Sequence, residues 1–283
     1  MGINEIIIYV MVFFMAVGAI DKCIGNKFGY GEKFEEGIMA MGALALSMVG
    51  IVSLAPVLAN ILKPIVGPVY SALGADPAMF ATTLLANDMG GYPLAMSLAQ
   101  DPMVGKFAGL ILGSMMGATV VFTIPVALGI IEKEDRPYLA KGVLAGMVAI
   151  PFGCLVGGLV AGFPLVTVLK NLVPIIIFAV LIIIGLWLIP EKMTTGFTYF
   201  GTGVVVVITI GLAAAIIENL TGFVVIPGMA PIDEGMGIIW SIAIVLAGAF
   251  PLVHFITKVF KKPLEKIGEK FKFLKHNYLT KKN

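Results

Sequence analysis

The chain has 283 residues, of which 59% are hydrophobic and 13% are charged, whereas an average soluble domain has roughly 25% charged residues. A soluble protein of this composition would expose far more apolar surface than water-soluble monomers tolerate. The composition therefore excludes an ordinary soluble domain and predicts an all-α, polytopic membrane helix bundle. A net charge of +2 gives no indication of nucleic-acid binding.

Seven stretches are long and apolar enough to cross a bilayer as helices, because about 20 such residues span the hydrocarbon core. No Lys or Arg precedes or lies in the first stretch, so we expect it to be a retained span and not a cleaved signal peptide. The predicted spans are residues 3–20, 37–62, 107–131, 142–167, 172–189, 196–217 and 235–257.

Glycines recur at every fourth position in the third span, at Gly109, Gly113 and Gly117. Such a stripe of small residues lets helix backbones approach closely. Membrane helices are also rich in glycine in general, so some of these spacings can arise by chance. We expect the spans to form a packed bundle.

Basic residues are distributed unevenly between the two sides of the predicted bundle. With the N-terminus outside, all 19 Lys and Arg residues except Lys63, Lys106 and Lys170 fall on the cytoplasmic side, as the positive-inside rule requires. We therefore expect a multi-pass protein with an external N-terminus and a cytoplasmic C-terminus.

Residues 64–105 must cross the membrane an even number of times or not at all, because one more span would place the lysine-rich C-terminus outside. Asp76-Pro77 is a good helix start, a helix is predicted over 78–88, and the glycines and proline of 89–93 should end it. Such a helix is about 16 Å long, half the membrane. We expect a re-entrant hairpin over about 76–102, the kind of discontinuous element that forms many transporter sites. The alternative is an extracellular loop with a short surface helix.

Asp88 is expected at the C-terminal end of this half-helix, where the helix dipole is also negative. Both charges favour a cation as the guest. Neutral hydrogen-bonding groups and an aromatic face lie nearby in the sequence. The candidate substrate-binding residues are Asp88, Asn87, Thr82, Thr83, Gly90, Gly91 and Tyr92. No metal site and no cofactor are predicted.

The second span aligns with the seventh at an offset of 195 residues and runs in the opposite direction. This is the pattern of inverted repeats in secondary transporters, although so few identities can also be accidental. The matched pairs are Gly42 with Gly237, Pro56 with Pro251, Lys63 with Lys258, and Pro68 with Pro263.

The repeat predicts a second hairpin after Pro263, but the sequence there is basic and amphipathic. We therefore divide the chain into a transmembrane helical domain, 1–260, and a cytoplasmic tail, 261–283. The tail is expected either to contact anionic lipid or to be solvated.

Blocks of sequence spread over the whole chain carry a family resemblance, at 1–7, 34–44, 54–59, 88–91, 109–117, 189–193 and 208–215. They resemble the EutH family, the ethanolamine permeases of bacterial ethanolamine-utilisation operons. The resemblance implies a bacterial cytoplasmic-membrane permease whose solute is ethanolamine, an amine that is cationic at neutral pH. It also implies further membrane segments after 262–264, so we expect this chain alone to transport weakly or not at all.

Two other functional classes stay open. An intramembrane enzyme would need a second catalytic group to act with Asp88, and Glu218 and His254 are the candidates, although no catalytic motif surrounds them. A lone histidine in the position of His254 is more often a packed residue than a ligand. A non-transporting scaffold that recruits partners through the tail is the other class. The partners expected of a permease are ethanolamine and the bilayer, with a homo-oligomer also allowed.

Overall fold

The computed structural model describes residues 2–124 and 136–270, and this part of the chain contains helices and no strand. The elements are α1 (Ile3–Cys23), α2 (Tyr30–Ala72), α3 (Ala78–Leu84), η1 (Asn87–Met89), α4 (Gly91–Leu98), α5 (Pro102–Lys106), η2 (Phe107–Gly117), η3 (Thr119–Thr123), α7 (Arg136–Val160), α8 (Leu165–Leu188), α9 (Pro190–Thr221) and α10 (Ile232–Lys270).

Five of these helices are long and apolar enough to cross a membrane, namely α1, α2, α8, α9 and α10. A shorter apolar helix, Ala145–Val160, lies within α7. The prediction of a polytopic α-helical membrane protein is confirmed. The third predicted span begins as the π-helical segments η2 and η3, and its remainder, 125–131, lies outside the described residues.

The predicted boundary between the fourth and fifth spans is wrong. Helix α7 ends at Val160 and α8 already begins at Leu165, seven residues before the predicted start. Gly162 adopts a positive φ of 84° in the intervening turn, and such a conformation ends a helix. Lys170, which was expected in an external connection, is therefore an exposed residue within α8.

The chain divides into two compact units. One comprises Met1–Ala43 and Ile238–Asn283, and the other comprises Leu44–Gly237. In the first, the buried side chain of Asp21 accepts hydrogen bonds from the N–H groups of Phe28, Tyr30 and Gly31, which fixes the turn between α1 and α2. The predicted tail begins within α10, which stays helical to Lys270, and 271–283 lie outside the described residues.

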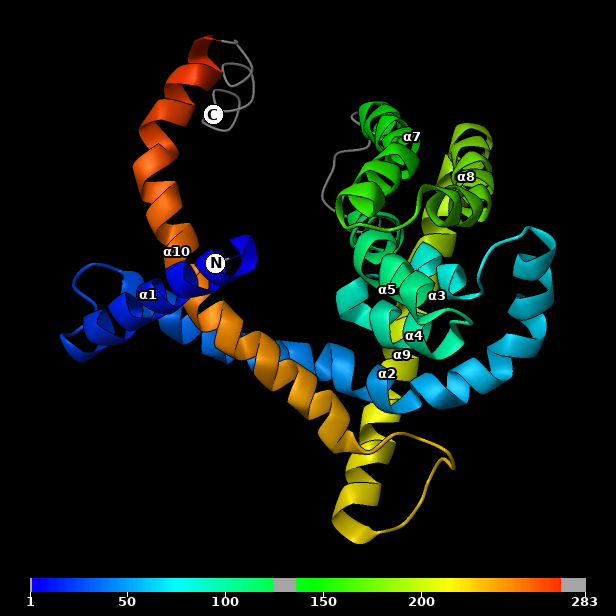
Figure 1. Cartoon of the computed structure of the whole chain (residues 1–283), viewed down its shortest axis with the longest axis horizontal. Coiled ribbons are helices and arrows are strands. Elements are labelled where there is room, and N and C mark those ends of the chain that lie inside the picture. The colour runs from blue at the N-terminus through cyan, green and yellow to red at the C-terminus, as the bar shows by residue number, and fades with distance from the viewer. Residues whose placement is uncertain (1, 125–135, 271–283) are drawn as a thin grey trace. The chain divides into compact units, whose positions relative to one another are not determined.

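The second unit is built around α3, α4 and α5, which Figure 1 shows surrounded by α7, α8, α9 and the cyan part of α2. That part of α2 contains Pro64 and Pro68, each of which removes a backbone hydrogen bond and permits bending. The side chains of Met79, Leu98, Phe107, Leu112 and Met116 are fully or almost fully buried at its centre. The predicted re-entrant region thus lies inside a packed core.

Candidate functional site

Two short helices separated by a break form the predicted re-entrant segment. Helix α3 covers only Ala78–Leu84, Leu85 and Ala86 are extended, and α4 starts at Gly91. The prediction of a continuous helix over 78–88 is wrong, because it ends four residues earlier. Asp88 lies in the separate 3₁₀ turn η1, so it gains nothing from the dipole of α3, which acts only over the last turn.

Asp76 joins the two ends of this segment. Its Oδ1 accepts a hydrogen bond from the N–H of Ala78 at 2.8 Å, and its Oδ2 accepts from the N–H groups of Gln100 at 3.0 Å and Asp101 at 2.9 Å. Asp76 is only 8% exposed, so these three donors replace water around the carboxylate. The sequence predicted the contact at the helix start and missed those at the other end.

The glycine stripe of η2 faces the re-entrant segment. A Cβ on Gly117 would collide with the backbone oxygen of Leu85, and a Cβ on Gly109 would collide with the ring of Tyr92. At Gly113 a Cβ would lie 3.1 Å from Thr82 and 3.2 Å from the Cβ of Asn87. Because these glycines lack a side chain, the broken backbone can approach η2 closely.

The predicted site residues differ in exposure and in hydrogen bonding. Asp88 is exposed, and its side chain has no hydrogen bond or ion pair with the residues that the structure describes. Asn87 is half-buried, and its Oδ1 accepts the N–H of Asp88 at 2.9 Å. Both residues belong to the break, but the amide oxygen of Asn87 is already used to shape the turn.

The two threonines are buried in α3, on the face toward the core. The hydroxyl of Thr83 donates to the backbone oxygen of Met79 at 2.6 Å, which is a structural use of its proton. The hydroxyl of Thr82 has no hydrogen-bond partner among the described residues, although the residue is fully buried. A buried, unpaired hydroxyl is costly, so of the two threonines Thr82 is the one whose hydroxyl is not already used.

Gly90 and Gly91 shape the break, and Tyr92 packs behind it. Gly90 has a φ of 82°, and a Cβ there would also collide with the side chain of Ile51, so only glycine fits. A Cβ on Gly91 would lie 2.6 Å from the backbone oxygens of Leu85 and Ala86. Tyr92 is half-buried over Gly109. The structure therefore brings Thr82 and Asn87 to Gly113, and Tyr92 to Gly109.

Sequence reasoning missed Asn171, a buried residue of α8 that bonds to the segment. Its Oδ1 accepts the N–H of Asp76 at 2.8 Å, and its Nδ2 donates to the backbone oxygen of Thr167. A polar residue within an apolar span is a signal of such a role. That signal was lost because the residue was predicted to lie in a connection.

His254, one of the two candidates for the second catalytic group of an intramembrane enzyme, packs edge-on against Tyr30 with ring centroids 5.1 Å apart. This is the environment of a packed histidine, the role that the sequence favoured.

Comparison with known sequences identifies the family. The profile of the family described as ethanolamine utilisation protein, EutH, matches residues 3–278. The chain belongs to the EutH family.

Relatives within the EutH family are similar over nearly all of this chain. It is 69% identical to the protein named "Probable ethanolamine permease EutH" of Listeria monocytogenes, over 95% of this chain and 72% of the relative. It is 50% identical to the protein of the same name from Salmonella typhimurium, over 95% and 75% of the two chains. It is also 54% identical to the uncharacterized protein YxeR of Bacillus subtilis, over 95% and 73%. No solved structure matches the chain.

Membership of the EutH family confirms the resemblance carried by the sequence blocks. Two of those blocks lie in the site: 88–91 contains the last part of the break, and 109–117 contains the glycine stripe that faces the segment.

Proposed function

We propose that this protein carries ethanolamine, or a similar small protonated amine, across the bacterial cytoplasmic membrane, and that Asp88 binds the ammonium group. The observation that carries the proposal is the exposed carboxylate of Asp88 in a break between two short helices. Discontinuous helices of this kind form the binding sites of many secondary transporters. The names of the EutH relatives support the choice of solute.

The position of the break supports a site within the membrane. Helix α3 is about 10 Å long at 1.5 Å per residue, and the extended residues that follow add up to about 3.3 Å each. From the Asp76 end, Asp88 therefore lies about 10 to 20 Å along the segment, in a hydrocarbon core about 30 Å thick.

The charge of Asp88 supports a cationic guest. A carboxylate at the centre of a bilayer costs about 2.5–3.5 kcal/mol on insertion scales, and a partner or water is needed to offset that cost. No described residue supplies a counter-charge to Asp88. An ammonium group would supply it, and an anionic solute would be repelled.

Uptake of labelled ethanolamine by proteoliposomes that contain this chain extended by the C-terminal segments of a EutH relative tests the proposal. Asp88→Asn removes the charge at nearly constant volume. A charged hydrogen bond contributes about 1.5–3 kcal/mol, so this change should lower saturable uptake by about ten-fold or more, while Asp88→Glu should retain part of it. Asp233→Asn, the same change at an exposed aspartate of α10, is the matched control.

Competition identifies the group that is recognised. Ethylamine, which keeps the ammonium, should inhibit uptake, and ethylene glycol, which replaces it with a hydroxyl, should not. Unchanged rate and affinity in Asp88→Asn would place the cation site elsewhere. An extended chain that inserts normally but gives no saturable uptake would instead favour the non-transporting scaffold.

A further inference from the structure

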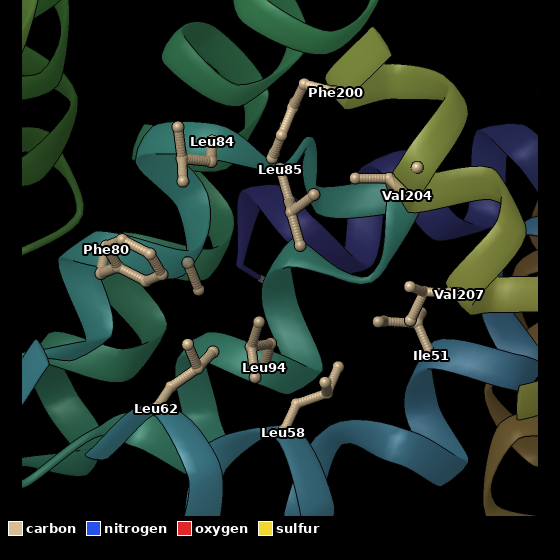
Figure 2. A pocket seen from close by; sticks show the side chains of 12 residues that line it. Ile51, Leu58, Leu62, Phe80, Leu84, Leu85, Leu94, Phe200, Val204 and Val207 are labelled. Atoms are coloured by element: carbon tan, nitrogen blue, oxygen red, sulfur yellow. The ribbon is translucent and has the colours of Figure 1, made fainter. Parts of the chain in front are cut away.

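An apolar cavity of about 410 Å³ lies against the re-entrant segment, and no residue of η2 is among those that line it. Figure 2 shows the side chains around it, including Leu58 and Ile51 of α2, Phe80 of α3, Leu94 of α4, and Phe200 and Val207 of α9. Its lining is hydrocarbon. Such a surface does not bind an ammonium ion or an inorganic anion, because it has no polar groups to replace the water that either ion would lose.

A second cavity of about 450 Å³ continues the first along α9. The two share Leu84 and Phe200 in their walls, and the second reaches Lys192 near the start of the helix. Lys192 is exposed and forms no ion pair with any residue that the structure describes. These two neighbouring cavities are together called the α9 groove below, which has one cationic end and apolar walls.

The length of the α9 groove matches one leaflet of a bilayer. From Lys192 to Gly203, which lines the first cavity, α9 advances about 16 Å at 1.5 Å per residue. One leaflet contributes about 15 Å of hydrocarbon. The apolar span of α9 is Thr195–Thr221, so Lys192 lies just outside it, at headgroup level, and the apolar end of the groove lies near its middle.

We propose that the α9 groove binds one acyl chain of an anionic phospholipid, whose headgroup is held by Lys192. Apolar walls select a hydrocarbon chain, and the lysine favours a negative headgroup in the adjoining leaflet. The chain would contact Phe80, Leu84 and Leu85 before the break and Leu94 after it. The bound lipid would therefore contact the segment on both sides of the break.

Gly203 allows a selective test, because a Cβ there meets no atom within 4 Å. Gly203→Leu should fill the cavity without displacing the helix. Gly146→Leu is the matched control, since Gly146 of α7 is also open and does not line the groove. Lys192→Gln tests the contribution of the lipid headgroup apart from that of the acyl chain.

Native mass spectrometry of the purified full chain, with phosphatidylglycerol or phosphatidylcholine added, measures the bound lipid. The unaltered chain and Gly146→Leu should retain one phosphatidylglycerol in preference to phosphatidylcholine. Gly203→Leu should lose it while eluting at an unchanged position in size exclusion, and Lys192→Gln should bind both lipids equally. Excess inorganic phosphate should not displace the lipid.

Three results would overturn the proposal. Equal retention of lipid by Gly203→Leu and Gly146→Leu would place the lipid outside the groove. Displacement by phosphate alone would indicate an anion site without an acyl chain. A dimer lost only in Gly203→Leu would make a second copy of the chain the occupant.

Discussion

The backbone N–H of Asp76 donates a 2.8 Å hydrogen bond to Oδ1 of Asn171, a residue 95 positions later in the chain. Both residues are buried, and the bond connects the start of the re-entrant segment to α8. The side chain of Asp76 meanwhile holds the end of the same segment through Gln100 and Asp101. Asp76 is thus the point at which three parts of the second unit meet.

Asp76→Asn should destabilise the protein by about 1–3 kcal/mol, because an amide has one acceptor oxygen for the three N–H donors that bind Asp76 and brings donors of its own. Thermal unfolding of the purified protein in detergent measures the effect. Asp88→Asn is the control within the same segment, since Asp88 is exposed and its side chain bonds to no described residue. Equal midpoints for the two variants would mean that the carboxylate of Asp76 is not needed for stability.

Asn171→Ala should lower the unfolding midpoint, because it leaves the buried N–H of Asp76 without an acceptor. Asn87→Ala removes the same kind of bond to the N–H of the exposed Asp88, which can bond to water instead, so its effect should be smaller. A larger effect for Asn87→Ala would show that the break, and not the contact with α8, holds the segment in place.

The loss of stability on replacing each η2 glycine by alanine should increase as the distance from its Cβ position to the re-entrant segment decreases. Gly117→Ala meets the backbone oxygen of Leu85, which cannot rotate away, and should cost about 1–3 kcal/mol. Gly113→Ala, whose Cβ would lie at 3.1 Å or more from its neighbours, should cost less. Gly146→Ala, with open space around it, should be neutral or slightly stabilising. Unfolding midpoints in any other order would contradict the packing described here.

Thiol labelling of intact cells tests the orientation. The exposed native Cys23 would react if reached, so it is first replaced by serine, and the buried Cys154 is kept. Single cysteines at the exposed positions Gly2, Gln100 and Asp233 should react with an impermeant reagent from outside, and one at Lys192 should not. Ala78 is unsuitable because it is fully buried. Labelling at Lys192 together with protection at Gln100 would show that the orientation is opposite to the predicted one.

Hydropathy was sufficient for the membrane helices, because each must supply a long apolar stretch whatever it packs against. The missed end of α7 had a local signal in Gly162 and Pro164, but glycine is common inside membrane helices and did not stand out. The early end of α3 had no local signal. Leu84, Leu85 and Ala86 contain no helix breaker, and the extended backbone at Leu85 packs against Gly117 of η2, a tertiary contact that no local pattern records.

The candidate site could be predicted only in part, because some of its contacts are likewise tertiary. The exposed carboxylate of Asp88 and the break at Gly90 follow from residue type. The buried bonds of Asp76 depend on residues 24, 25 and 95 positions away, and only the folded chain shows which distant donors meet it. That Asp88 binds a substrate stays a prediction.

The bonds from Asp76 to Gln100 and Asp101 close the re-entrant segment into a ring of about 25 residues. Because these bonds hold the two ends of the segment together, α3 and α4 cannot swing apart while the bonds persist. Any movement that exposes Asp88 alternately to the two sides must therefore carry the ring as one rigid body, or shift the surrounding helices past it. Gly74, two residues before Asp76, has a φ of 71°, so the turn that leads into this ring depends on a glycine.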